Sequence, residues 1–150
     1  MSSFQTPTRL VNLTPHDCVI MQGGGDDPLV RSVIPTHGAV MRVQTGEQRK
    51  LGELCPDVPI FSPPEFSDEL DWPALDADVD AVLVSLLVGQ AAKRIAERGY
   101  EMPYAVYVPD TGPASAVRDE DGGIVGVRRL VLYARRRLAV RRREAHEPGL

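Results

Sequence analysis

Short apolar runs separated by turn residues make up the first third of the chain. The runs at 9–13 and 18–22 are rich in β-favouring residues and predict two strands. The glycine-rich stretch at 23–28 predicts a turn that brings the run at 29–35 back beside 18–22 as a hairpin. At 39–43 apolar and polar positions alternate, as they do in a half-buried strand. The pattern therefore favours a sheet in which neighbouring segments pair.

The pattern decays between residues 45 and 80. Proline lacks an N–H group and has a fixed φ, so the five prolines of this stretch exclude long regular elements. They are Pro56, Pro59, Pro63, Pro64 and Pro73. One short strand is expected near the sequence VPIF at 58–61. A connection of this length is uncommon in a compact domain and is often functional, so we expect an ordered but irregular excursion.

One helix stands out in the second half of the chain. The apolar run at 81–84 predicts a short strand, and Ser85 is a suitable N-cap for the element that follows. From 86 to 98 several apolar positions share one helical face, and Gly99 is placed to end the helix. Gly89 weakens this helix, because glycine costs about 1 kcal/mol relative to alanine inside a helix.

After the helix the pattern returns to strands. A strand is expected at 104–108, and the sequence from 116 to 134 predicts a hairpin, because Asp-Gly-Gly lies between two valine-rich runs. The expected fold is one α+β domain over 1–134, with a mostly antiparallel sheet, one principal helix at 86–98 and the long acidic excursion. An Arg-rich C-terminal tail at 135–150 follows, either as a short basic helix or as a frayed end.

Charge is divided unevenly along the chain, although the net charge is only −4. Residues 51–92 contain nine acidic residues and no Lys or Arg, whereas from residue 126 onward there are eight Arg and two Glu. The tail is therefore able to dock on the acidic segment of the same chain or of a neighbouring subunit, and we expect a homo-oligomer. Nucleic-acid binding by the tail is disfavoured, because the tail lacks interleaved aromatic residues and no helix-turn-helix or zinc pattern accompanies it.

No sequence motif points to a metal, a cofactor or a membrane. The chain has no C-x-x-C, H-E-x-x-H, G-x-S-x-G or P-loop pattern. No apolar run reaches the ~18 residues of a membrane span, and we find no leader-like segment. We therefore expect a cytoplasmic protein whose Cys18 and Cys55 are reduced thiols.

The stretch NLTPHD is the first candidate site. Pro15 pre-sets a turn, and Asn12 and Asp17 are able to hydrogen-bond nearby backbone groups. The favoured interpretation is a bend between strands in which His16 satisfies buried backbone groups. The alternative is that Thr14 and His16 face a pocket, with His16 as a ligand contact or as an acid or base.

The second candidate site is the loop PDTGP, which follows the expected strand at 104–108. Asp110 and Thr111 lie at the strand end, where side chains often reach a ligand, and Arg118 follows on the approach to the next strand. A guanidinium near the helix N-terminus at Ser85 suits a phosphate or a carboxylate, because free N–H groups and the helix dipole favour an anion. The alternative is a capped turn with Arg118 in a surface ion pair.

Three blocks of the sequence together resemble a known family. VNLTPHDCVI near the start, AVLVSLLVGQAA in the middle and VYVPDTGPASAVRDEDGGIVGVRRL near the end are similar to a family of short uncharacterised proteins of bacteriophages, prophages and high-GC bacterial genomes. The positions that match the family pattern are Asn12, Thr14, Pro15, His16, Ser85, Asp110, Thr111, Gly112, Arg118, Asp119, Gly122, Gly126 and Arg128. His37, the acidic insert and the Arg-rich tail depart from it. The resemblance implies no established activity.

These observations favour a non-enzymatic protein that binds a small anionic ligand. The phage and prophage context, which comes only from the resemblance, would suit sequestration of a phosphorylated or nucleotide-like metabolite. The candidate ligand-binding residues are Asn12, Thr14, His16, Ser85, Asp110, Thr111, Arg118 and Arg128. One alternative is a small hydrolase or lyase with His16 as general base and Asp110 as its orienting carboxylate. The other is an accessory DNA- or protein-binding factor that acts through the Arg-rich tail.

Overall fold

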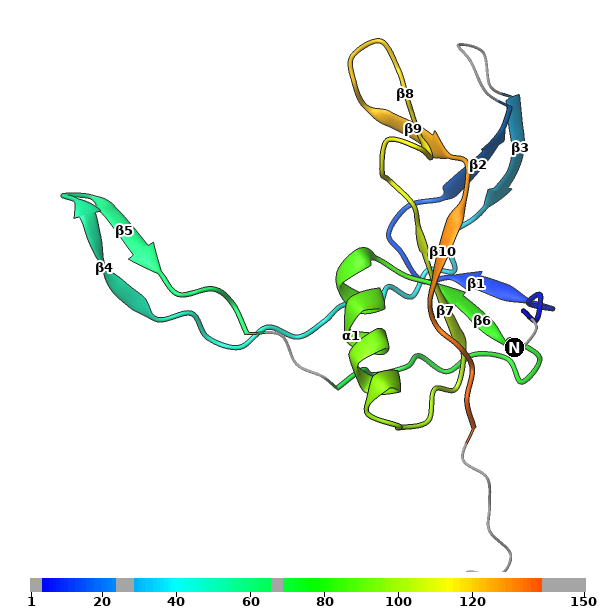
Figure 1. The fold of residues 1–150 in the computed structure, drawn as a ribbon, viewed down its shortest axis with the longest axis horizontal. Coiled ribbons are helices and arrows are strands. Elements are labelled where there is room, and N and C mark those ends of the chain that lie inside the picture. The colour runs from blue at the N-terminus through cyan, green and yellow to red at the C-terminus, as the bar shows by residue number, and fades with distance from the viewer. Residues whose placement is uncertain (1–3, 24–28, 66–68, 139–150) are drawn as a thin grey trace, which may run out of the picture.

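A computed structural model of the chain describes residues 4–23, 29–65 and 69–138. Its elements follow in the order β1 (Leu10–Asn12), β2 (Cys18–Gln22), β3 (Leu29–Ile34), β4 (Lys50–Cys55), β5 (Val58–Phe61), β6 (Ala81–Leu83), α1 (Leu86–Glu97), β7 (Ala105–Pro109), β8 (Ala116–Arg118), β9 (Ile124–Val127) and β10 (Leu130–Ala134). Within the described residues these strands form three sheets, and α1 packs against β7 and β10 (Figure 1). The α+β class with one principal helix is confirmed.

The central sheet, sheet A, contains β1, β6, β7 and β10 in that order. β1 pairs with β6, and β6 with β7, in parallel, whereas β10 runs antiparallel to β7. Parallel neighbours need a crossover instead of a tight turn, and α1 supplies the crossover between β6 and β7. The expectation of a mostly antiparallel sheet is therefore wrong. Local β propensity identifies the individual strands of sheet A. The crossover through α1 makes β6 and β7 parallel, and local propensity does not predict this.

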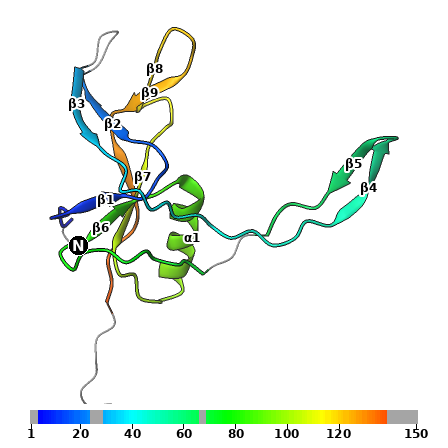
Figure 2. The same ribbon diagram turned by 180° about the vertical axis from the view of Figure 1, so that it is seen from behind.

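The second sheet, sheet B, has the order β3, β2, β9, β8 and joins two hairpins. β2 pairs with β3, and β8 with β9, in antiparallel fashion, so the first predicted hairpin is confirmed and the second is confirmed as far as Val127. A parallel contact between Ile20 and Val127 links the hairpins. After β9 the chain enters sheet A as β10. Figure 2 shows sheet B beyond one end of sheet A.

The apolar core lies on both faces of sheet A. Because successive side chains of a strand point to opposite faces, Val82 and Val106 pack with Val88 of α1 in one buried cluster. On the other face Leu83 packs with Val127 of sheet B in a second cluster. Both ends of the connection between β6 and α1 are thus fixed by packing.

Residues 39–43 do not form a strand, although their alternation predicted one. Met41 is buried, and its N–H donates to the carbonyl of Leu13 at 3.0 Å. Met41 thus fixes this stretch to the core, but no described strand pairs with residues 39–43. Whether an alternating sequence forms a strand depends strongly on such neighbours.

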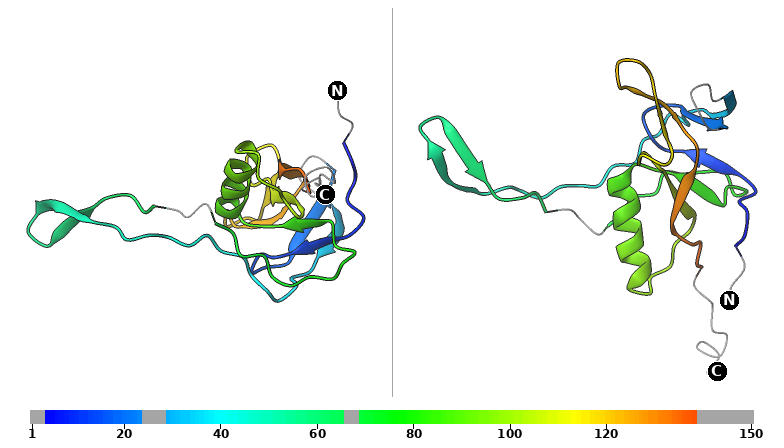
Figure 3. Two further views of the ribbon diagram at one scale, coloured as in Figure 1. Left: turned by 90° about the horizontal axis from the view of Figure 1, so that it is seen from below. Right: turned by 45° about the horizontal axis from the view of Figure 1, so that its top comes forward.

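Residues 46–65 form a hairpin that projects from the body and that we call the arm (Figures 1 and 3). The strand expected near 58–61 is confirmed as β5, but its partner β4 was not predicted. Asp57 lies at the tip with a φ of 72°, a left-handed conformation that Asp tolerates better than most residues. The acidic excursion therefore contains a regular element.

The Arg-rich tail is described only as far as Leu138. Arg137 pairs with Met102 through two backbone hydrogen bonds of 2.6 and 2.8 Å, and residues 139–150, on which the docking expectation mainly rests, lie outside the described residues. In the acidic segment, Asp76 and Asp78 both pair with Arg9. The described part of the chain has no helix long and apolar enough to cross a membrane. Cys18 and Cys55 are both free thiols.

Candidate ligand-binding site

The carboxyl ends of β1, β6 and β7 meet at one cavity of about 370 Å³. Parallel strands deliver the loops that follow them to a single edge, which is where ligands bind in open α/β sheets. The start of α1 and strand β9 complete the cavity wall. Its polar lining includes Thr14, His16, Ser85 and Thr111, four of the eight residues singled out from the sequence.

Asn12, the last residue of β1, organises the loop that carries His16. Its side chain is buried and donates to the carbonyls of His16 and Ile34, both at 2.9 Å. Its Oδ1 accepts from the N–H of Thr14 at 2.9 Å and from the Thr14 hydroxyl at 2.7 Å. These bonds occupy the amide, so Asn12 holds the loop in place instead of lining the cavity.

His16 lines the cavity, and its ring does not serve the bend. Its backbone carbonyl accepts from the Asn12 amide and lies 2.8 Å from the Thr14 hydroxyl. No described residue hydrogen-bonds the imidazole. The backbone groups of this bend are thus bonded by Asn12 and Thr14 and not by the His16 ring. The imidazole remains available to a ligand, since its two nitrogens supply a donor and, when neutral, an acceptor.

Ser85 and the first turn of α1 form the next part of the wall. Ser85 is the N-cap residue, as predicted, but its hydroxyl makes no capping hydrogen bond. The first bond back into the helix runs from the N–H of Gly89 to the Ser85 carbonyl at 2.9 Å, and the N–H groups before it have no partner inside the helix. Together with the positive end of the helix dipole, they favour an anionic or hydrogen-bond-accepting group here.

The loop after β7 contributes Thr111 to the cavity but not Asp110. The Oδ2 of Asp110 accepts from the Nε of Arg129 at 2.6 Å, and its Oδ1 accepts from the N–H of Gly112 at 2.9 Å. The loop is thus a capped turn, as one alternative described, but its ion pair is made by Arg129 and not by Arg118, which that alternative named. Asp110 therefore stabilises the loop from outside the cavity, and Thr111 is the residue of this loop that lines it.

Neither predicted arginine lies at the cavity. Arg118 donates to the carbonyl of Gly122 at 2.6 Å, and Arg128 donates to the carbonyl of Gly23 at 2.9 Å. Within the described residues no Arg or Lys lines the cavity. The guanidinium expected beside Ser85 is therefore not found there, and α1 itself is the positive element of this wall.

The contacts of Asp110 predict a stability effect in acid. The hydrogen bond from Arg129, followed by the one from Gly112, lowers the pKa of the Asp110 carboxyl. A carboxyl whose pKa is lower folded than unfolded stabilises the fold above the unfolded value of about 3.9, and this contribution disappears as the pH falls through the folded value. Urea unfolding at a series of pH values below 5 should therefore show a smaller loss of stability for Asp110→Asn than for the wild type. Asp121→Asn, in an exposed turn, serves as the control and should retain the wild-type slope; an equal slope for Asp110→Asn would contradict the prediction.

The apolar walls of the cavity were missed by reasoning from sequence. Val84 and Val108 come from the strand ends of sheet A, and Ile124 and Val127 come from β9. A valine in an apolar run is typical of core, so residue type alone does not mark these positions; their place at the ends of parallel strands does. Cys18 lines the same cavity, and burial raises the pKa of its thiol, which makes it a poor nucleophile.

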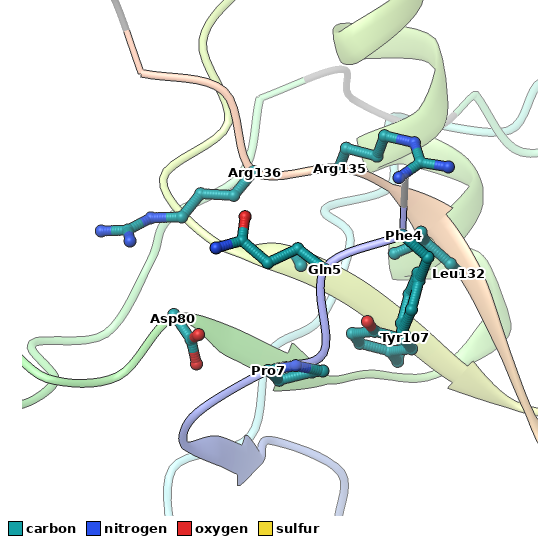
Figure 4. A pocket seen from close by; sticks show the side chains of 9 residues that line it. Phe4, Gln5, Pro7, Asp80, Tyr107, Leu132, Arg135 and Arg136 are labelled. Atoms are coloured by element: carbon teal, nitrogen blue, oxygen red, sulfur yellow. The ribbon is translucent and has the colours of Figure 1, made fainter. Parts of the chain in front are cut away.

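A second cavity of about 270 Å³ lies at the amino ends of β6 and β7, beneath the N-terminal segment (Figure 4). Tyr107 lines it with a buried hydroxyl that has no hydrogen-bond partner among the described residues. Asp80 also lines it, and its carboxylate accepts from the N–H groups of Thr8 and Arg9 at 2.8 Å each. Burial, with a smaller contribution from Asp80, raises the pKa of Tyr107. None of the eight candidate ligand-binding residues lines this cavity, but Arg135 and Arg136, the first two residues of the predicted Arg-rich tail, do.

Neither a metal-binding cluster among the described residues nor a similar protein of known function identifies a ligand, so the proposal below rests on the geometry of the cavity. In the described part of the chain, no group of three or more His, Cys, Asp or Glu side chains could hold a metal ion. Comparison with protein-family models, with curated proteins and with solved structures found no match.

Proposed function

We propose that the protein binds a small anionic ligand, such as a phosphorylated or nucleotide-like metabolite, in the cavity at the carboxyl ends of β1, β6 and β7. The observation that carries this proposal is the convergence of three parallel strand ends and the uncapped N-terminus of α1 on one cavity. Its volume of about 370 Å³ lies within the usual range of small-molecule sites, about 300–1,000 Å³.

The lining of the cavity suits a ligand with two parts, an anionic group and a flat apolar moiety. The anionic group belongs beside Ser85 and the first turn of α1, where helix N–H groups bind phosphates without a lysine or arginine. Asp17, which also lines the cavity and accepts from the N–H of Thr36 at 2.9 Å, repels an anion on its own side. The valine-rich walls suit a flat apolar moiety such as a nucleobase, and Thr111 and His16 supply hydrogen-bonding groups at its edge.

Binding without conversion is favoured over hydrolysis or lyase chemistry. A catalytic His16 needs a partner that orients its ring, and Asp110, the expected partner, is bonded to Arg129 and Gly112 outside the cavity. The buried thiol of Cys18 is a poor nucleophile. The resemblance to phage and prophage proteins further supports a sequestering role, in which the ligand is held and later released unchanged.

Calorimetric titration with AMP, adenosine and inorganic phosphate tests the proposal. We expect AMP to bind more tightly than adenosine or phosphate, because only AMP occupies both the apolar walls and the start of α1. His16→Ala should weaken AMP binding about fivefold, the effect of one hydrogen bond to an uncharged group, which contributes about 1 kcal/mol. His37→Ala, at an exposed histidine outside the cavity, should leave it unchanged. Absence of AMP binding, or equal effects of the two substitutions, would contradict the assignment, and conversion of AMP would favour the enzymatic alternative.

A further inference from the structure

The arm presents a row of apolar side chains that nothing in the described chain covers. All ten residues of β4 and β5 are exposed. The large apolar ones include Leu51, Leu54 and Phe61, with exposed fractions of 63%, 75% and 50%. Contiguous exposed apolar residues on a soluble protein usually mark an interaction surface.

The hydrogen bonds of the arm are local to it. The N–H of Gly46 donates to the carbonyl of Glu65 at 2.7 Å, and the N–H of Ser62 donates to the carbonyl of Arg49 at 2.8 Å. Figures 1 and 3 show the arm extending away from both larger sheets. Because an isolated two-stranded hairpin is at best marginally stable in water, a regular hairpin in this position calls for a surface that covers it.

Two β-bulges expose the leucines of the arm. The register passes from the pair Lys50 and Phe61 to the pair Gly52 and Ile60, which leaves Leu51 without a cross-strand partner. In the same way Leu54 falls between two paired positions. A bulge redirects the side chain of the extra residue and twists the strand, so both leucines are available to a docking partner.

We propose that the arm is a dimerisation element that docks on the body of a second copy of this chain. Its strands contain ten residues, whereas a stable interface takes about 20–30 residues and about 800 Å² from each partner. One arm on an unrelated partner would fall short of that size. Reciprocal exchange across a twofold axis gives each subunit an arm and a receiving surface, which doubles the contact and leaves no arm uncovered.

Strand β3 is the receiving edge on the body. It lies at the edge of sheet B, and Leu29, Val30 and Val33 on it are exposed by 71%, 58% and 48%. An open apolar edge strand offers unpaired backbone groups to an added strand. An anionic membrane is a poorer partner for the arm, because residues 46–65 contain four acidic and two basic residues.

Sedimentation velocity of the full chain tests the dimer, independently of the ligand site. The wild type should sediment with twice the mass of the chain, and the double variant Leu51→Ser/Leu54→Ser should sediment as a monomer with an unchanged circular dichroism spectrum of the body. Tyr100→Ser, at an equally exposed apolar position outside the arm, should remain dimeric. A wild-type monomer at every concentration, a double variant that stays dimeric, or arm-dependent flotation of a monomer with phosphatidylglycerol vesicles would overturn the proposal.

The native Cys55 at the tip of the arm tests the receiving edge. Cys55 is exposed, whereas Cys18 is buried, so oxidation of Val30→Cys should link Cys55 of one chain to residue 30 of another. The same variant with Cys55→Ser is the control and should lack this particular link in peptide mass mapping. An arm-dependent dimer that forms no Cys55 crosslink to residue 30 would overturn β3 as the receiving edge.

Discussion

Replacing Asn12 by alanine is expected to lower the free energy of unfolding by about 3–5 kcal/mol. Asn12 is 1% exposed, and its side chain bonds two carbonyls and one N–H of the surrounding backbone. Removing the amide leaves the Ile34 carbonyl and the Thr14 N–H without this partner in a partly buried site, whereas the His16 carbonyl still has the Thr14 hydroxyl at 2.8 Å. Each buried polar group left unpaired costs about 1–3 kcal/mol.

Urea unfolding of Asn12→Ala beside Gln90→Ala measures this effect. Gln90 is an exposed residue of α1, so its truncation should change the free energy of unfolding by less than about 0.5 kcal/mol. A loss below about 1 kcal/mol for Asn12→Ala would show that the loop carrying His16 does not depend on this amide.

Gly89→Ala is expected to destabilise the fold by about 2 kcal/mol, although alanine is the better helix former by about 1 kcal/mol. A Cβ on Gly89 would overlap the Cγ2 of Val108 and approach the ring of Tyr133 to 3.3 Å. Glycine is thus required for the close approach of α1 to β7, and the added methyl group would push the helix away from the sheet.

Gly52→Ala is the matched control for Gly89→Ala. A Cβ on Gly52, in β4 of the arm, meets no atom within 4 Å, so the substitution should be neutral or slightly stabilising. A gain in stability for Gly89→Ala in the same urea titrations would contradict the packing of α1 against β7 and therefore the wall that α1 gives to the cavity.

The strands and the helix were predictable where apolar residues recur at the period of the element. In β4 this period is broken, and the strand was missed. Its two apolar anchors, Leu51 and Leu54, are three residues apart because each lies at a bulge, so the two-residue period of a strand is absent. Parallel pairing in sheet A was also missed, because a sequence pattern records which face of a strand is buried but not which strand lies beside it.

The candidate site was predictable after the parallel strands of sheet A and not at the strands of sheet B. Thr14 and Ser85 follow apolar runs directly, and Thr111 lies two residues after the end of β7. Parallel strands bring such positions to one edge. Arg118 is the last residue of β8, an antiparallel strand of sheet B, and its direction depends on the carbonyl of Gly122 in the following turn. A residue type that suits a phosphate does not by itself indicate where its side chain points.

Amide chemical shifts of the full chain during titration with AMP test the ligand site residue by residue. We predict that the shifts concentrate at 14–19, at 85–88 in the first turn of α1, at Thr111 and along β9, with the N–H groups of the first turn moving most because the phosphate binds them. AMP should be recovered unchanged afterwards. Shifts centred on Asp80 and Tyr107 at the other end of sheet A, or no shifts at all, would contradict the assignment of the ligand site to the carboxyl ends of the parallel strands.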